Sequence, residues 1–372
     1  MAKPRVILVG GFLGAGKTTL LAEAALRLTR QGKQVGIVAN DQAADLVDTQ
    51  LFRQTGAAVE EVTGGCFCCR FPDMVAAIER IVHQSRIDVI LGEPVGSCTD
   101  LSATVLQPLK HQYGDRWELA PFTVLIDAAQ VRALARLSQA QASSPPERFS
   151  DQVLYIYEKQ LSEADLIVLN KVDLILPEEL AHIQRAFQER LPETPILTMS
   201  AATGEGLDAW LERVNQPGPV GKRIVEVDYD RYAAGEAELG WMNLSAKLQA
   251  KQPVDWRTFA VELFERIREG LGSRGARIAH VKLFLTSPGA YLAGNLVSNE
   301  SPAAVRGEMD SSHSAAALLV NARVQTQPEV LQRVVQEALH GAAGDRIAFS
   351  ITNLRCFFPP RPQPTYRYPN VM

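Results

Sequence analysis

The chain has 372 residues, a length that allows one to three domains. Hydrophobic residues make up 46% and charged residues 22%, which excludes wholesale disorder. With 38 basic and 42 acidic side chains the net charge is −4, so a globally electropositive surface for nucleic acid or anionic lipid is not expected. Five cysteines are too few for a disulfide scaffold, and no apolar run approaches the roughly 18 residues of a membrane helix. We therefore expect a cytoplasmic globular protein that binds neither nucleic acid nor membrane.

Short apolar runs alternate with longer helical stretches over the first 215 residues. The runs lack a period of two, as is typical of strands buried on both faces of a parallel sheet. We expect strands at residues 6–9, 35–39, 87–91, 122–127, 166–169 and 195–199, and helices at 18–29, 72–84, 177–190 and 207–214. This order predicts an α/β fold with a doubly wound, mostly parallel sheet.

The pattern changes at residues 216–222, where proline and glycine block helix and strand alike. We interpret this segment as a linker between a first domain at 1–215 and a smaller C-terminal α+β domain at 223–358. In the second domain we expect strands near 223–229, 239–248, 278–286, 315–322 and 346–353, and helices near 256–271 and 329–339. Residues 359–372 form a proline-rich tail, which we expect to be extended. A polar segment with two prolines at 138–148 predicts a mobile surface loop.

Residues 11–18 fit the Walker A pattern G-x-x-x-x-G-K-[ST], with an expected strand before them and an expected helix after them. In such a loop the glycines let backbone N–H groups surround phosphate oxygens, and the helix N-terminus adds its positive dipole end. Lys17 is expected to reach the outer phosphates, and the Thr18 hydroxyl to ligate Mg²⁺. The expected phosphate-binding residues are Gly14, Ala15, Gly16, Lys17, Thr18 and Thr19. The pattern predicts a nucleoside triphosphate site.

The strand expected at 166–169 is followed by an N-K-x-D element. The carboxylate of Asp173 can accept hydrogen bonds from N1–H and the 2-amino group of guanine, and adenine offers neither donor. Lys171 is expected to lie along the base, and Asn170 to brace the loop. Ser200 and Ala201, after the next expected strand, match a second loop that contacts the base. These residues favour GTP over ATP.

A second acidic position follows the strand expected at 87–91. Glu93 is placed to hold Mg²⁺ through water or to orient the attacking water, and the backbone N–H of Gly96 to sense the γ-phosphate. We take Lys17 and Glu93 as the candidate catalytic residues. The alternative for Glu93 is an exposed carboxylate at a strand end.

Three of the five cysteines lie within four positions, at Cys66, Cys68 and Cys69. Reduced thiolates are soft ligands that favour Zn²⁺, Cu(I) and, less exclusively, Co²⁺ or Fe²⁺, and three of them leave one tetrahedral position open. Cys98 is a candidate for approach to this cluster if both loops meet at the same sheet edge. The alternatives are small buried hydrophobic residues or a redox switch. The six histidines are scattered and none pairs at metal-ligand spacing.

Four motifs together resemble the CobW branch of the CobW/HypB/UreG P-loop GTPases, which are metallochaperone-type proteins. They lie at residues 10–19, 65–69, 93–96 and 170–173, and the resemblance covers about the first 215 residues. It implies metal-dependent GTP hydrolysis coupled to the delivery of Zn²⁺ or Co²⁺. The family's cysteine motif would correspond to Cys66, Cys68 and Cys69, and its acidic switch motif to Glu93.

The chain departs from the family pattern in two places. The first switch usually reads Asn-Glu-Phe-Gly-Glu with an aspartate a few residues later, and residues 40–45 read Asn-Asp-Gln-Ala-Ala-Asp. The second glutamate therefore falls on Ala44, for which Asp45 can substitute. The resemblance implies Asp41, Asp45 and Asp48 as further candidate metal ligands. The second switch reads Glu-Pro-Val-Gly in place of Glu-Thr-Thr-Gly or Glu-Ser-Ser-Gly.

The main expectation is a GTP-hydrolysing metallochaperone with GTP, Mg²⁺ and Zn²⁺ or Co²⁺ as its ligands. Its partner would be a client metalloprotein or an enzyme of cofactor biosynthesis, and a homodimer is an open alternative. Intrinsic hydrolysis is expected to be slow because no motif assigns an arginine finger or a catalytic glutamine. The alternatives are a redox- or metal-sensing regulatory GTPase adaptor without metal transfer, a P-loop kinase or ATPase, and a protein-interaction module.

Overall fold

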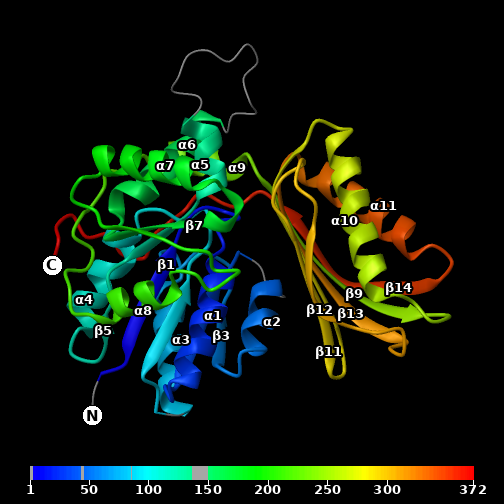
Figure 1. The fold of residues 1–372 in the computed structure, drawn as a ribbon, viewed down its shortest axis with the longest axis horizontal. Coiled ribbons are helices and arrows are strands. Elements are labelled where there is room, and N and C mark those ends of the chain that lie inside the picture. Colours follow the sequence, from blue (N-terminus) through cyan, green and yellow to red (C-terminus); the bar gives the residue numbers. More distant parts are fainter. Residues whose placement is uncertain (1–2, 43–45, 85, 136–149) are drawn as a thin grey trace. The chain divides into compact units, whose positions relative to one another are not determined.

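The computed structural model describes residues 3–42, 46–84, 86–135 and 150–372. The chain forms two compact units (Figure 1). The first consists of Met1–Gln42, Phe52–Gly235 and Arg361–Met372, and the second of Ala43–Leu51 and Glu236–Pro360. The division after Gly235 lies beyond the linker expected at 216–222. The surface loop expected at 138–148 lies outside the described residues.

A parallel sheet forms the centre of the first unit. In spatial order its strands are β3 (Ala58–Val62), β2 (Val35–Asn40), β4 (Val89–Glu93), β1 (Arg5–Gly10), β6 (Thr123–Asp127), β7 (Leu166–Asn170) and β8 (Ile196–Thr198), and the short β5 (Glu118–Leu119) pairs with the start of β1. Every residue of β1, β2, β4, β6 and β7 is buried, which confirms the expectation of strands covered on both faces. The chain runs outward in both directions from β1, so β1 lies at the switch point of a doubly wound sheet.

Helices follow the strands of this sheet, as the alternating sequence pattern predicts. They are α1 (Lys17–Arg30), α3 (Phe71–Gln84), η1 (Ser102–Leu106), α4 (Gln107–Tyr113), α5 (Ala128–Ala135), α6 (Asp151–Glu163), η2 (Val172–Leu174), α7 (Pro177–Arg190), α8 (Leu207–Asn215) and α9 (Tyr229–Ala237). α1 buries Leu20, Leu21, Ala24, Ala25 and Leu28, at the spacing of one helix face. These side chains join a core with Trp210 of α8, and they fix the helix that begins at the end of the Walker A segment.

The sequence did not reveal β3, the strand that leads into the cysteine cluster. β3 contains Glu60 and Glu61, and four of its five residues are only half-buried because it lies at the edge of the sheet. An edge strand needs no continuous apolar run, so the signal that identified the central strands is missing here.

The prediction of a strand at 223–229 is wrong. No strand forms there, and α9 begins at Tyr229. Just before this segment the backbone N–H groups of Gly221 and Lys222 donate to the carboxylate of Asp165, at 2.7 and 3.0 Å. Arg223 in turn donates to the Thr194 hydroxyl at 2.5 Å. Side chains of the first unit thus bind the segment without a neighbouring strand.

The second unit is an antiparallel sheet backed by two helices. Its strand order is β12 (Ala304–Glu308), β11 (Ala290–Leu296), β10 (Arg277–Ser287), β13 (Ala315–Gln325), β9 (Gly240–Ala250) and β14 (Ile347–Phe357). Figure 1 shows α10 (Trp256–Gly272) and α11 (Pro328–Ala343) side by side on one face of this sheet. Their buried side chains form one core with the sheet. The smaller α+β fold is therefore confirmed, with β11 and β12 as strands that the sequence pattern missed.

A short helix from the first half of the sequence belongs partly to this second unit. α2 (Val47–Arg53) begins with Val47, whose backbone N–H donates to the Asn321 side chain at 2.8 Å. Val47 also packs in a small cluster with Phe284 and Ala293. Asp48 pairs with Lys282. These contacts attach residues 46–51 to the antiparallel sheet.

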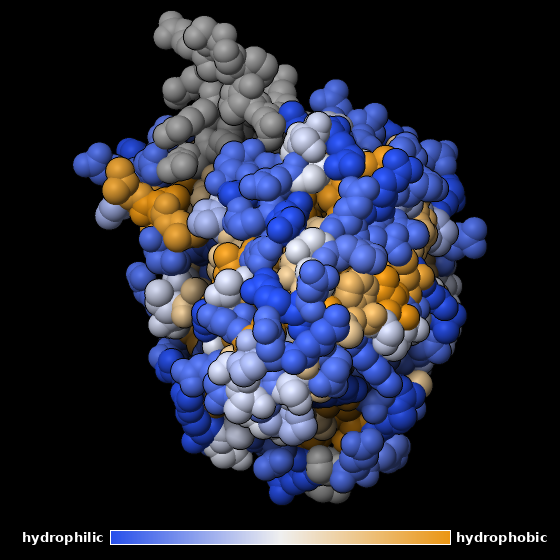
Figure 2. Space-filling view, turned by 90° about the vertical axis from the view of Figure 1, so that its right-hand side faces the viewer, coloured by the Kyte–Doolittle hydropathy of each residue, from blue (hydrophilic) through white to orange (hydrophobic). Residues whose placement is uncertain are grey.

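Polar side chains dominate the face of the molecule that Figure 2 shows, with smaller hydrophobic patches between them. This distribution agrees with the location of the large apolar side chains in the two cores. Among the described residues, no helix combines the length and the apolar character that a membrane crossing requires.

The C-terminal segment Arg361–Met372 returns to the first unit, where it has no helix or strand, as expected for a proline-rich tail. The Thr365 backbone N–H donates to the carbonyl of Cys68 at 2.8 Å, and that of Tyr368 to the carbonyl of Ala103 at 3.0 Å. The tail therefore runs beside the segment that carries the cysteine cluster.

Candidate functional site

The candidate groups of the first unit follow the carboxyl ends of its parallel strands. The Walker A segment follows β1, the cysteine cluster β3, Glu93 ends β4, Asn170 ends β7, and Ser200 comes two residues after β8. In a doubly wound sheet ligands bind at this edge, beside the switch point. The fold thus gathers groups that are more than 180 residues apart in the sequence.

The Walker A loop adopts a conformation that glycine permits. Gly11, Gly14 and Gly16 all have positive φ angles, of 127°, 79° and 99°. A Cβ on Gly11 would lie 2.2 Å from the carbonyl oxygen of Leu125, so the loop also needs glycine for its close approach to β6. Lys17 is 6% exposed, and its ammonium donates to the carbonyl oxygens of Gly11 at 2.7 Å and Phe12 at 3.2 Å. The loop therefore holds its own lysine over its concave side.

Thr18 and Glu93 meet beside this loop. The Thr18 hydroxyl donates to the Glu93 carboxylate at 2.9 Å, and both residues are only 7% exposed. Gly96, three residues beyond Glu93, packs so closely that an added Cβ would lie 3.0 Å from the Lys17 ammonium nitrogen. A hydroxyl, a carboxylate and an ammonium group, brought from two strand ends, thus lie together.

Asn170 braces the loops on the other side of β1. Its amide nitrogen donates to the carbonyl of Ala15 at 2.8 Å, and its amide oxygen accepts from the backbone N–H of Ala201 at 2.9 Å. A Cβ on Gly16 would lie 2.4 Å from the same amide nitrogen. One buried side chain therefore fixes the Walker A loop against the loop at Ser200, which agrees with the bracing that the sequence predicts.

Lys171 and Asp173 differ sharply in their surroundings. Lys171 has a left-handed backbone, with φ of 64°, and its ammonium pairs with Asp127 at 2.7 Å. Asp173 is exposed. The sequence analysis missed Asp127, although its place as the last residue of an expected strand was a usable signal. Its carboxylate also accepts from the backbone N–H of Ala129 at 2.9 Å, so it links the N-terminus of α5 to the N-K-x-D element.

The cysteine cluster is a tight turn between β3 and α3. Gly64 has φ of 79°, and the backbone N–H of Arg70 returns to the carbonyl of Cys66 at 2.9 Å. Asn40, the last residue of β2, forms hydrogen bonds with the backbone of this turn. Its amide donates to the carbonyl of Gly65 at 2.8 Å and accepts from the backbone N–H of Phe67 at 2.8 Å. Asn40 is thus a positioning residue for the cysteines.

The three sulfurs lie close enough to share one ion. The Sγ atom of Cys66 lies 2.8 Å from that of Cys68 and 3.2 Å from that of Cys69, and Cys68 and Cys69 are 3.7 Å apart. Thiolates that share a tetrahedral Zn²⁺ at about 2.3 Å would be ~3.8 Å apart. The turn needs to open by no more than about 1 Å to match that geometry. Cys66 and Cys68 are buried, and Cys69 is half-buried.

Hydrogen bonds between the sulfurs give the three thiols different pKa values. The pKa of Cys66 is held well below its usual value, chiefly by its side-chain hydrogen bonds with Cys68, Cys69 and Cys98. The same bond to Cys66 raises the pKa of Cys68 well above the usual range and that of Cys69 to about 12. Cys66 is therefore the thiol of the group that loses its proton most readily. A thiol with a lowered pKa among neighbouring thiols suits either a soft metal or an oxidation reaction.

Two of the three first-switch acids, Asp41 and Asp48, are described, and they belong to different units. Asp41 follows β2, and its backbone N–H donates to the carbonyl of Val62 at 3.1 Å. Asp45 lies outside the described residues. Asp48 pairs with Lys282 within the second unit, so a role for Asp48 as a metal ligand requires this ion pair to break.

Two buried acids beside the second switch segment, which follows β4, were not predicted from the sequence. Asp100, fully buried and with φ of 64°, accepts from the Tyr229 hydroxyl and from Arg367, each at 2.7 Å. Glu163 of α6 accepts from the backbone N–H of Ser102 at 2.8 Å. Burial raises the pKa of Glu163 to about 8 and also raises that of Asp100. No local pattern marks Glu163, because its burial depends on packing from distant segments.

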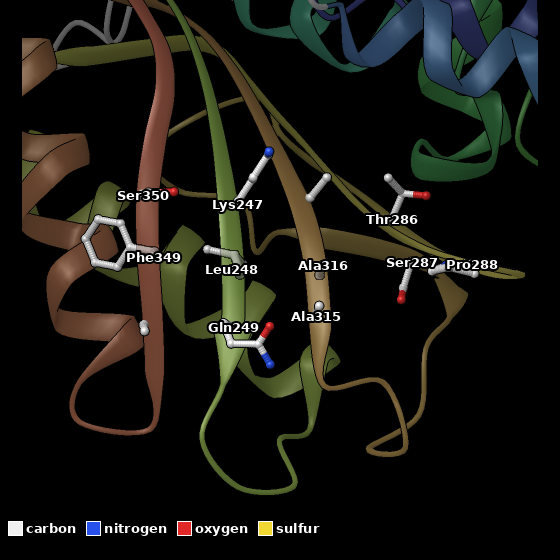
Figure 3. A pocket seen from close by; sticks show the side chains of 12 residues that line it. Lys247, Leu248, Gln249, Thr286, Ser287, Pro288, Ala315, Ala316, Phe349 and Ser350 are labelled. Carbon is white, nitrogen blue, oxygen red and sulfur yellow. The ribbon is translucent and has the colours of Figure 1, made fainter.

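The second unit has a separate hollow of about 570 Å³ at one end of its sheet. Figure 3 shows Lys247, Gln249, Thr286 and Ser287 around it, with alanines between them. Among its lining residues there is no cysteine, histidine or carboxylate, so it offers none of the groups that characterise the first unit.

The fold and the Walker A geometry define the class of the first unit as a P-loop nucleotide-binding domain. The chain belongs to the CobW/HypB/UreG family, a family of GTPases: the model of that family's nucleotide-binding domain matches residues 5–198, just over half of the chain. The resemblance found in the sequence motifs is thereby confirmed.

Several characterised proteins are similar to this chain. A zinc chaperone CobW of Sinorhizobium sp is 30% identical over 220 residues, which are 53% of this chain and 58% of that protein. The zinc chaperone YeiR of Escherichia coli K12 is 29% identical over 187 residues, 50% of this chain and 52% of that protein. The chain thus spans little more than half the length of these relatives. The Zn(II)-bound YjiA GTPase of E. coli is 16% identical, with a TM-score of 0.36 over 91% of this chain and 99% of that one.

Replacement of Glu163 by glutamine should flatten the pH dependence of stability. The unfolded glutamate releases its proton near pH 4.3, whereas the folded one retains it up to about pH 8. The folded state binds more protons in this window, so its free energy of unfolding falls as the pH rises, by up to about 1.4 kcal/mol per pH unit. Urea unfolding at pH 6 and pH 8 measures this slope. Glu158→Gln, in an exposed ion pair of the same helix, is the matched control. An equal slope in wild type and Glu163→Gln would contradict the assignment.

Proposed function

We propose that this chain is a GTP-hydrolysing metallochaperone that binds Zn²⁺ or Co²⁺ at its cysteine turn and couples the nucleotide to metal transfer. The observation that carries the proposal is the single segment from Glu93, the last residue of β4, to Cys98. Glu93 accepts from Thr18 of the Walker A helix, and five residues later Cys98 hydrogen-bonds to Cys66. A movement of this segment is the proposed link between the nucleotide and the cysteine turn.

The Walker A loop supports binding of the triphosphate. The backbone of residues 14–19 would surround the phosphates, with Lys17 transferring its hydrogen bonds from Gly11 and Phe12 to the outer phosphates. The Thr18 hydroxyl and the Glu93 carboxylate, 2.9 Å apart, are the hard oxygen donors that suit Mg²⁺. When bound, this ion supplies charge neutralisation on the phosphate oxygens.

Hydrolysis requires water to attack the γ-phosphorus as the bond to the GDP oxygen breaks. Glu93 would orient that water, Lys17 would neutralise charge on the transferred group, and the backbone N–H of Gly96 would sense the γ-phosphate. The bond between Thr18 and Glu93 keeps this carboxylate beside the phosphate loop before substrate arrives. A slow intrinsic rate remains our prediction.

Selection of guanine would depend on the loops after β7 and β8. Asp173 is exposed and free to accept from N1–H and the 2-amino group of the base. Lys171, tied to Asp127, would lie along the ring, and Asn170 would hold Ala201 and Ser200 at the base edge. The membership of a GTPase family supports the same choice.

We propose that the transferred metal ion binds to Cys66, Cys68 and Cys69. The chain's similarity to proteins named zinc chaperones supports zinc, and soft thiolate ligands also accept Co²⁺. Transfer to a client metalloprotein or an enzyme of cofactor biosynthesis requires ligands that can let the metal leave. The half-buried Cys69 is the sulfur at which a client would have access. Asp41 and Asp48 remain candidates as secondary ligands.

A redox-sensing GTPase adaptor is the second candidate function. The Sγ atoms of Cys66 and Cys68 lie 2.8 Å apart, and Cys66 has the low pKa of a reactive thiolate. Protein purified without oxygen distinguishes the two functions by elemental analysis. About one equivalent of zinc or cobalt supports the chaperone, whereas metal-free protein with oxidation-dependent GTPase activity supports the sensor.

Replacement of Asp173 by asparagine should switch the base that the protein prefers. The amide loses one acceptor for guanine but gains a donor for the 2-carbonyl of xanthine, so GTP affinity should fall at least about tenfold while XTP affinity rises. Fluorescence titration with both nucleotides measures the switch, and Asp208→Asn, in an exposed ion pair with Arg27, serves as the matched control. Unchanged discrimination between the two bases would remove Asp173 from the base site.

Replacement of Cys66 and Cys68 together by serine should abolish metal binding and spare the nucleotide. Two of three soft ligands are lost, so Zn²⁺ affinity should fall at least about 100-fold, whereas the Walker A loop is unchanged. Competition with a chromophoric chelator measures zinc, and Cys356→Ser, in the second unit, is the control. If the double variant still binds zinc as wild type does, the cysteine turn is not the metal site.

A further inference from the structure

Cys98 lies on the inner side of the cysteine cluster. It is 1% exposed, and its side chain hydrogen-bonds to Cys66 and Cys68, the two buried members. Only Cys66, Cys68 and Cys69 among the described residues have sulfurs that all lie within 4.8 Å of one another, so the Sγ atom of Cys98 lies farther than this from at least one of them. Three thiol groups from the turn after β3 and one from the segment after β4 are therefore near neighbours.

The backbone around Cys98 is fixed in this position. Its N–H donates to the carbonyl of Val95 at 2.9 Å. The amide of Gln160 in α6 donates to the carbonyls of Cys98 and Gly96, at 2.8 and 3.0 Å. Binding of one ion by all four sulfurs requires Cys98 to move closer to the other three, from a backbone position that α6 holds.

We propose that Cys98 is the fourth ligand of the metal, so that the site is a four-sulfur site with one ligand on the switch segment. The inference rests on the proposed metal function. Four thiolates suit a tetrahedral Zn²⁺ and close the site, whereas three leave a position for water. Because Cys98 follows Gly96 by two residues, the fourth ligand is the one that a nucleotide-dependent shift of this segment would withdraw.

X-ray absorption of the zinc-loaded, full-length protein counts the sulfurs directly. Wild type should show four sulfur ligands at about 2.3 Å, and Cys98→Ser should show three with one lighter atom. In the cobalt-loaded protein, the sulfur-to-metal charge-transfer absorbance of Cys98→Ser should fall to about three quarters of the wild-type value. Cys356→Ser should leave both readouts unchanged.

The outcomes separate this inference from the function on which it rests. Three sulfurs in wild type, or equal charge-transfer absorbance in wild type and Cys98→Ser, would overturn the fourth ligand and leave the three-cysteine site intact. A wild type that binds neither metal would overturn both. Because the count on wild type needs no substitution, misfolding of a variant does not affect it.

The C-terminal tail carries a second inference, independently of Cys98. The backbone N–H of Gln363 donates to the Sγ atom of Cys69 at 3.2 Å, and Thr365 bonds to the carbonyls of Cys68 and Cys69, at 2.8 and 3.1 Å. Tyr366 packs edge-on against Phe71, with ring centroids 5.3 Å apart. The tail therefore contacts the sulfur that is not already enclosed by the turn.

One ion pair with a buried acid anchors this tail. Arg367 donates to the fully buried Asp100 at 2.7 Å, and Asp100 lies two residues after Cys98 on the second switch segment. Removal of the guanidinium leaves the buried carboxylate without this positive partner, so the anchor is costly to remove. We infer that residues 363–367 are a lid over Cys69 whose anchor is the second switch segment.

Thiol reactivity of the metal-free protein tests the lid without relying on metal binding. A chain that ends at residue 362, and separately Arg367→Ala, should let a small alkylating reagent modify Cys69 at least about tenfold faster, as followed by peptide mass spectrometry. Arg361→Ala, which breaks only an exposed pair with Asp230, is the matched control. Equal Cys69 rates in wild type and in both variants would overturn the lid, whatever the metal site proves to be.

Discussion

The strands of a parallel sheet all end at the same edge, and every candidate group of the first unit depends on this constraint. β1, β3, β4 and β7 each present their last carbonyl and the following loop there, so the Walker A loop, the cysteine turn, Glu93 and Asn170 become neighbours. β1, β4 and β7 are buried on both faces, and this core packing opposes any slip of one strand against the next. Chemistry that needs groups from distant parts of the chain is thereby assembled without a separate scaffold.

Two asparagine side chains hold the loops at that edge in place through hydrogen bonds to their backbone. Asn170 ties Ala15 to Ala201 with one donated and one accepted hydrogen bond. Asn40 donates to Val62 and Gly65 and accepts from Phe67, so it ties the end of β3 to the cysteine turn. Removal of either buried amide would leave backbone polar groups unpaired. The phosphate loop and the cysteine turn are thus held by the same device at opposite sides of the sheet.

The segment from Glu93, at the end of β4, to Asp100 connects these two sides. Glu93 lies beside Thr18, Gly96 beside Lys17 and Cys98 beside the sulfurs, and Asp100 binds the tail through Arg367. Coupling between a nucleotide and a metal requires an element whose position both ligands bias. This segment meets the structural part of that requirement, since its bonds extend from the phosphate loop to the cysteine cluster.

The sequence by itself determined the α/β class, the central strands, both helices of the second unit, and the residue motifs of the Walker A, N-K-x-D and cysteine loops. These features are encoded locally, in apolar runs and in residue types at fixed spacing. The tertiary structure alone decided that β3 is an edge strand despite its glutamates, and that the backbone of Gly221 and Lys222 binds the Asp165 side chain while no strand forms at 223–229. It also decided that Asn40, Asp127 and Glu163 support the site, and that the tail returns to the first unit. The physical reason is that burial and hydrogen-bond partners are set by segments far apart in the chain, whose proximity no local pattern encodes.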